Sequence, residues 1–159
     1  MLRRVLLSRV LLTAAISFAF VSVASAANIQ YVAKLSGAHQ VPKVDSNGVG
    51  KFEATLDTTS KLLTYTLTFD KLSGPATMAH VHGPASKTEN AGVMLALGDK
   101  NPTSPLTGSV TLTDDQIKAL QAGKMYVNVH TAANANGEIR GQIHRAPAQK
   151  PAAAKKSAS

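Results

Sequence analysis

Several short stretches of the chain alternate apolar and polar side chains, as half-buried β-strands do. In the clearest, Leu63, Tyr65, Leu67 and Phe69 occupy every second position and threonines lie between them. Because successive side chains on a strand point to opposite faces, this pattern predicts an antiparallel sheet with one apolar and one polar side. Shorter runs of the same kind occupy residues 31–35, 52–56, 80–82, 93–97, 110–112, 125–130 and 138–144.

One segment has a different pattern. Thr113 stands directly before Asp114 and Asp115, and Gln116 follows it at the spacing of a capping box. We therefore expect one short helix over residues 113–122, ending before Gly123. Many short strands, turn residues between them and a single short helix are typical of an all-β fold, here an antiparallel Greek-key β-sandwich or a small Greek-key barrel.

The first 26 residues have the features of a signal peptide. Arg3, Arg4 and Arg9 precede an uncharged apolar run at 10–24, and Ala24-Ser25-Ala26 forms a small-residue cleavage site. We expect the mature chain to begin at Ala27 and to be periplasmic or secreted. A membrane anchor is the alternative, but the run is shorter than the roughly 18 to 20 residues of a membrane span. No integral membrane segment is expected after cleavage.

The remaining chain divides into a folded domain, residues 27–144, and an Ala-, Lys- and Pro-rich tail, residues 145–159, which we expect to be disordered. The chain has no cysteine, so packing alone has to stabilise an exported domain. The net charge of +8 comes mostly from the two ends, because residues 27–144 carry ten basic and nine acidic side chains. This near-neutral domain lacks the basic surface that nucleic-acid binding requires.

The candidate chemistry lies in three histidines. His80 and His82 are two residues apart and so share one face of a strand, while His130 ends a second strand. Three imidazoles suffice for an open metal site, and copper binds more tightly than zinc to such nitrogen ligands. The alternative is that these histidines hydrogen-bond the backbone and hold the turn at Gly83-Pro84. Both interpretations stay open at this stage.

Four further residues have candidate roles around such a site. Met78 shares the strand face of the first two histidines, and its thioether would favour Cu(I). Asn128 and Glu138 could orient the imidazoles, although plain surface exposure explains both more simply. Arg140 could guide an anion to the open metal position. We expect Glu138 and Arg140 on the exposed face of the last strand. Catalytic motifs such as G-x-S-x-G or a phosphate-binding glycine loop are absent from the sequence.

Several separate motifs in order resemble one family. They are Leu35-Ser36-Gly37-Ala38 with Val41-Pro42, the run at 79–85, the run at 126–131 after Gly123, and the run at 136–143. Over roughly residues 29–144 the chain resembles the CHRD domain, found in the animal protein chordin and in secreted bacterial proteins. The resemblance implies an extracytoplasmic, immunoglobulin-like β-sandwich. It implies little about activity, and His39-Gln40 stands where the family usually has a Gln-Glu pair.

A second resemblance concerns the copper site of copper-zinc superoxide dismutase. Its pattern of His-Val-His, a later Val-x-His and a following arginine is similar to His80, His82, His130 and Arg140 here. No histidine lies between His82 and His130, so the bridging histidine and the zinc ligands of that family are missing. The resemblance implies a copper-only or vestigial site.

Two functions are consistent with these observations. One is an exported domain that binds a copper-type metal ion through His80, His82 and His130, with dismutase-like redox activity if it is an enzyme at all. The other is a non-enzymatic adhesion module that binds a protein or surface partner without metal. The sequence favours a binding protein over an enzyme, and zinc is the second choice of metal.

Overall fold

The structure is a computed structural model that describes residues 28–147. The predicted signal peptide and almost all of the predicted tail lie outside the described residues. No helix within residues 28–147 is long and apolar enough to cross a membrane.

The all-β expectation is confirmed, because each alternating run of the sequence lies in or beside a strand. The described chain contains nine strands: β1 (Asn28–Ser36), β2 (Val49–Asp57), β3 (Leu62–Asp70), β4 (Ala76–His82), β5 (Val93–Gly98), β6 (Leu106–Thr111), β7 (Tyr126–Thr131), β8 (Ile139–Gln142) and β9 (His144–Arg145). A short 3-10 helix, η1 (Gly37–His39), follows β1.

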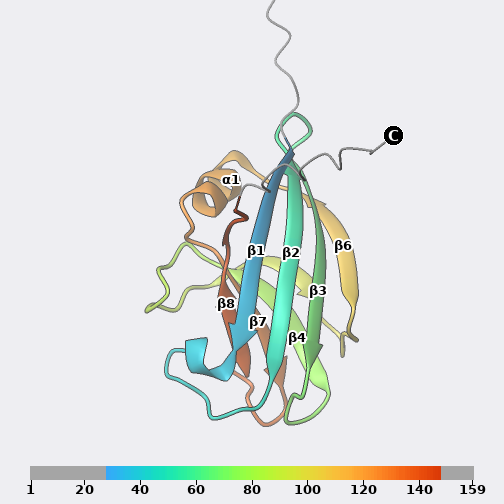
Figure 1. Ribbon diagram of the computed structural model, residues 1–159, viewed down its shortest axis with the longest axis vertical. Helices are drawn as coiled ribbons and strands as arrows, with labels where there is room; N and C mark the ends of the chain where they lie inside the picture. Colours follow the sequence, from blue (N-terminus) through green and yellow to red (C-terminus); the bar gives the residue numbers. More distant parts are fainter. Residues whose placement is uncertain (1–27, 148–159) are drawn as a thin grey trace, which may run out of the picture.

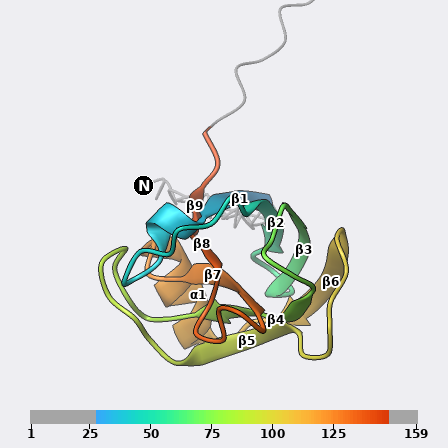
Figure 2. The same cartoon turned by 90° about the horizontal axis from the view of Figure 1, so that it is seen from below.

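The strands form one antiparallel sheet rather than two separate ones. Their order is β5-β4-β7-β8-β1-β2-β3-β6, with β9 pairing beside β1. The sheet curls until it is nearly closed (Figures 1 and 2), and the Tyr65 hydroxyl of β3 donates to the Leu97 carbonyl of β5 at 3.4 Å across the gap. All-β architecture is therefore correct, whereas the two-sheet immunoglobulin-like or Greek-key sandwich is not confirmed.

The single predicted helix is α1 (Asp114–Gln121), and its capping box is complete. The Gln116 amide donates to the Thr113 hydroxyl at 3.2 Å, and the Thr113 amide donates to the Gln116 side chain at 2.9 Å. The Gln116 side chain also donates to the Met94 carbonyl of β5. Leu120 then reaches the core, so α1 is held against the sheet at both its polar and its apolar side.

The core fills the inside of the curled sheet. Phe52 faces Leu67 across β2 and β3, and Leu56 faces Leu63, all four essentially unexposed. On the other side of the ring, the inward positions of β4, β7 and β8 are also apolar and buried: Ala79, Val81, Val127, Val129 and Ile139. The polar positions of these three strands therefore lie on the outer face of the sheet.

Two loops cover that outer face. The β1–β2 loop, residues 37–48, and the β4–β5 loop, residues 83–92, are joined by the Asn90 side chain, which donates to the Val41 carbonyl at 2.7 Å. Gln40 donates to the Asn128 side chain on β7 at 2.7 Å. We call residues 83–92 the cover loop. Because of these loops, the outer face of β4, β7 and β8 is polar but largely buried.

Glu138 shows this burial most clearly, and its expected exposure is wrong. Its side chain is fully buried and accepts hydrogen bonds from Ser46, Ser73 and Thr131, which belong to three different parts of the chain. Burial alone would raise the pKa of Glu138, but the hydrogen bonds outweigh it and hold the pKa at about 2. The carboxylate therefore fastens the β1–β2 loop and the β3–β4 connection to the end of β7.

Replacing Glu138 with Gln should lower the free energy of unfolding by about 3 kcal/mol at neutral pH. The folded pKa of about 2 lies below the ordinary value of 4.5, so the ionised carboxylate stabilises the fold above pH 4.5. That contribution is lost as the pH falls through 2. Denaturant unfolding of wild type and E138Q at pH 7, 4 and 2.5 should show that the difference between their free energies of unfolding becomes smaller as the pH falls. Glu53→Gln, on an exposed side chain, is the control; an E138Q difference that does not change with pH would contradict this assignment.

Candidate metal centre

The three candidate histidines lie on neighbouring antiparallel strands. His80 and His82 are on the outer face of β4, and His130 is on the same face of β7. In the register of the two strands His80 pairs with Asn128 and Met78 pairs with His130, so His130 stands diagonally across from His80. The pairing thus brings together side chains that are fifty residues apart in sequence.

Their imidazole rings form a compact group. Ring centroids are 5.1 Å apart for His80 and His130, 5.7 Å for His80 and His82, and 6.0 Å for His82 and His130. One nitrogen from each ring lies within 4.8 Å of the corresponding nitrogens of the other two. The three side chains therefore converge, as expected from the sequence for a metal site.

The rings are buried although they lie on the side of the sheet away from the core. The three histidines are only 6 to 8 % exposed. The cover loop accounts for their burial, because it runs over the outer face directly after His82. This burial lowers the pKa of His82 and of His130 below the ordinary imidazole value, since desolvation disfavours the charged ring.

Each ring uses one nitrogen to bind a fixed oxygen. His82 Nδ1 is 3.0 Å from the Ala91 carbonyl, His130 Nδ1 is 3.0 Å from the Ala135 carbonyl, and His80 Nε2 is 3.2 Å from the Asp99 carboxylate. A carbonyl only accepts, so Nδ1 of His82 and of His130 must carry the hydrogen. In the neutral rings, Nε2 of both then holds a lone pair.

The second nitrogen of each ring has no such acceptor. His80 Nδ1, His82 Nε2 and His130 Nε2 are buried and have no hydrogen-bond partner among the described residues. Metal-binding histidines in proteins have this arrangement, with one nitrogen bound to a carbonyl or carboxylate and the other free for the ion. The cluster therefore offers three buried nitrogen donors without protein partners.

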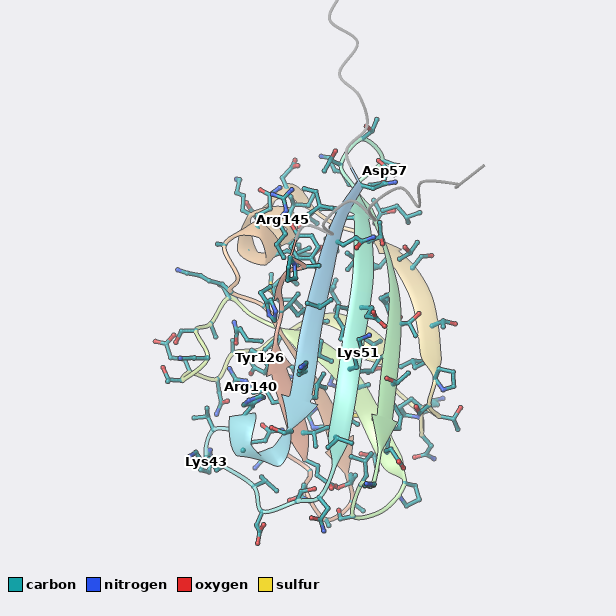
Figure 3. The ribbon with its side chains drawn as sticks, viewed as in Figure 1. Lys43, Lys51, Asp57, Tyr126, Arg140 and Arg145 are labelled. Carbon is teal, nitrogen blue, oxygen red and sulfur yellow. The ribbon has the colours of Figure 1, made fainter. Side chains whose placement is uncertain are left out.

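Tyr126 and Arg140 support this group from one side. The Tyr126 ring stacks on His82, with centroids 5.1 Å apart and planes within 7°. In the sheet Tyr126 pairs with His82 on one side and with Gln142 of β8 on the other, and the Arg140 guanidinium lies 3.5 Å from the centre of the tyrosine ring (Figure 3). The stack of Arg140, Tyr126 and His82 fixes the plane of the histidine ring.

Arg140 also holds the cover loop, and its expected exposure is wrong. It is 1 % exposed, and its guanidinium donates to the Asn90 side chain and to the carbonyls of Ser86 and Glu89 at 2.8 to 3.0 Å. Desolvation lowers the pKa of Arg140 from its ordinary value. These contacts make it an anchor of the loop, in place of the free cation that anion guidance would need.

The other three expected neighbours have separate contacts. Asn128 accepts from Gln40 and donates to the Asn136 carbonyl at 3.2 Å, and Glu138 binds the hydroxyl groups described above. Gly137 has a positive φ of 118°, and a side chain there would overlap the Asn128 amide. Met78 is partly exposed at the strand position opposite His130. The structure thus gives Asn128 and Glu138 contacts with loops, not with the imidazoles.

Sequence reasoning missed the residues that orient the rings. Asp99 and the carbonyls of Ala91 and Ala135 belong to loops, and no pattern marks a backbone carbonyl as a partner for a distant imidazole. Asp99 alone has a signal in the sequence, because it is an acidic residue in the loop that follows the predicted strand 93–97. The two other histidines of the described residues, His39 and His144, are exposed and lie outside the cluster.

A comparison with models of protein families agrees with the resemblance that the sequence motifs indicated. The model of the CHRD domain matches residues 31–143, which is most of the chain. No curated protein and no solved structure matches the chain. The chain therefore belongs to the CHRD-domain family, whose domains are extracellular.

Replacing Arg140 with Lys should loosen the cover loop while leaving the core intact. Lysine keeps the charge but loses the planar fork that reaches three acceptors and stacks on Tyr126. We expect the free energy of unfolding to fall by about 2 to 4 kcal/mol and hydrogen exchange at the Ala91 amide, which donates to the Tyr126 hydroxyl, to become faster. Arg145→Lys, on the exposed β9, is the control. Unchanged exchange at Ala91 in R140K would show that Arg140 does not hold the loop.

Proposed function

We propose that this CHRD-domain chain is an exported protein that binds one transition-metal ion through His80, His82 and His130, with copper as the first candidate. The observation that carries the proposal is that each of the three rings has a buried nitrogen without a partner, and that the three rings can each bring one nitrogen within 4.8 Å of the others. Imidazole nitrogens suit both copper and zinc, and copper is preferred because Cu(II) binds more tightly than Zn(II) to the same nitrogen ligands.

The energetic argument starts from the cost of leaving these nitrogens unpaired. A buried polar atom without a partner costs about 1 to 3 kcal/mol, and three occur at one point. A single water molecule cannot satisfy them, since it donates only two hydrogens to three acceptors. Protonating one ring is disfavoured for His82 and His130 because burial lowers their pKa. A metal cation satisfies all three lone pairs at once.

The distances fit a metal after a small contraction. Three atoms within 4.8 Å of one another leave a point that is at most about 2.8 Å from each of them, whereas a metal–imidazole bond is about 2.0 to 2.1 Å. Each ring nitrogen therefore has to move inward by about 0.7 Å or less. Their anchoring acceptors lie in loops, which can accommodate such a shift.

Three protein ligands leave at least one coordination position for water or a small molecule. Such a site could store or carry copper, or could support copper-dependent redox chemistry. The buried rings and the absence of a free cation at Arg140 favour metal binding over catalysis. The exported location rests on the predicted signal peptide.

A metal titration tests the proposal directly. Purified, chelator-treated domain should bind one equivalent of Cu(II) by calorimetry and elemental analysis, and His130→Ala should weaken binding by at least about 100-fold. His144→Ala removes an exposed histidine outside the site and should leave binding unchanged. Equal binding by wild type and H130A would refute the site and favour the alternative, a binding module without metal.

The carboxylate behind His80 gives a second, graded test. Asp99→Asn removes the charge that orients His80 but leaves all three ligands, so metal affinity should fall by about 10- to 100-fold. Asp115→Asn, an exposed acidic residue on α1, is the matched control for the lost charge. If D99N and D115N bind the metal with the same affinity, the proposed orientation of His80 is wrong.

A further inference from the structure

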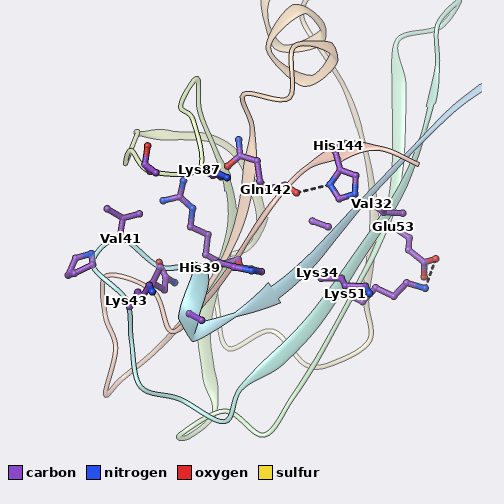
Figure 4. A pocket seen from close by; sticks show the side chains of 16 residues that line it. Val32, Lys34, His39, Val41, Lys43, Lys51, Glu53, Lys87, Gln142 and His144 are labelled. Carbon is purple, nitrogen blue, oxygen red and sulfur yellow. Dashed lines mark hydrogen bonds and ion pairs between the residues drawn. The ribbon is translucent and has the colours of Figure 1, made fainter. Parts of the chain in front are cut away.

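A hollow on the outer surface is separate from the histidine cluster. It has a volume of about 830 Å³ and lies over β1, between η1 and the following residues on one side and β8 and β9 on the other (Figure 4). Its apolar lining, which we call its floor, is formed by the side chains of Val32, Ala38, Val41 and Pro42. Pockets that bind small molecules have this size and a mostly apolar lining.

Positive charge surrounds this floor. Lys34, Lys43, Lys51 and Lys87 line the hollow, and they come from β1, the β1–β2 loop, β2 and the cover loop. The carboxylate in the lining is Glu53, which is already paired with Lys51 at 2.7 Å. No ion pair in the described part of the chain uses Lys34, Lys43 or Lys87. We call this hollow the lysine groove.

We propose that the lysine groove binds an elongated carboxylate with an apolar hydrocarbon body, that is, a free fatty acid. The hydrocarbon would cover the apolar floor and so remove its surface from water. The carboxylate would bind one or more of the unpaired lysines at the rim. The apolar lining thus calls for the hydrocarbon part of the ligand, and the lysines call for its carboxylate.

Other ligand classes fit less well. A small hydrophilic anion such as phosphate would leave the floor in water, and an apolar cation would meet an excess of like charge. A neutral long-chain alcohol could cover the floor but would gain nothing from the lysines. The preference for the carboxylate over the alcohol of equal length therefore measures the contribution of the charged rim.

The groove does not depend on the proposed metal site. None of His80, His82 and His130 lines it. The two regions share the two covering loops and Arg140, which lines the groove and stacks on Tyr126 beside His82, but no candidate metal ligand belongs to the groove. The binding experiment can therefore be run on metal-free protein, and its outcome is separate from that of the metal titration.

The first experiment compares three ten-carbon ligands on the wild-type domain. Decanoate, decanol and decyltrimethylammonium are titrated below their aggregation concentrations, with binding followed by calorimetry and by amide chemical shifts. Decanoate should bind with at least tenfold higher affinity than the other two, and its shifts should map to Val32, Lys34, Ala38 and Lys87. Equal affinity for decanol, or shifts elsewhere on the domain, would overturn the proposal.

Variants then separate the groove from general surface charge. The double variant Lys34→Glu with Lys87→Glu should weaken decanoate binding by about tenfold or more, because two attractions become repulsions. Lys100→Glu with Lys118→Glu makes the same change in net charge on residues that do not line the groove, and it should bind like wild type. Ala38→Trp should block decanoate and decanol alike by filling the groove. Equal weakening by the two double variants would show that only net charge acts.

Discussion

The outer face of β4, β7 and β8 imposes the constraint on which this structure depends. Polar side chains that are buried must find hydrogen-bond partners, and here loops supply them. The Arg140 guanidinium donates hydrogen bonds to the cover loop, and the Glu138 carboxylate accepts hydrogen bonds from hydroxyl groups in three parts of the chain. Each histidine binds one oxygen through one ring nitrogen. Among the described residues, four buried side-chain atoms are left without a hydrogen-bond partner: the Gln142 side-chain oxygen and one nitrogen of each of His80, His82 and His130. Three of the four belong to a single cluster of rings, and that concentration identifies the candidate site.

The same sheet therefore has two different sides. Its inner side is an apolar core that requires no disulfide, and its outer side carries the chemistry. The cover loop and the β1–β2 loop are part of both functional regions, since they bury the histidines and also border the lysine groove. A rigid core with functional loops packed on one outer face is a common way to position ligands precisely.

Much of the fold could be predicted from local sequence, because alternation reports strand faces and the capping residues report the helix. The candidate ligands were also predictable, since two histidines at i and i+2 must share a face. What could not be predicted was burial. Period-two alternation places Glu138 and Arg140 opposite the core, but it contains no information about loops that return to cover that face. The partners Asp99, Ala91 and Ala135 were missed for the same reason, because loop positions follow from tertiary packing.

The most direct test of the central claim is to measure which nitrogen of each imidazole carries the hydrogen, by nitrogen-15 NMR. Spectra are compared for the metal-free domain and for the domain with one equivalent of Zn(II), which serves as a diamagnetic substitute. Without metal, we predict hydrogen on Nδ1 of His82 and His130 and on Nε2 of His80. With metal, only the opposite nitrogen of each ring should shift strongly, while His39 and His144 stay unchanged. Hydrogen on Nε2 of His82 or His130, or no metal-dependent shift in any of the three rings, would contradict the account.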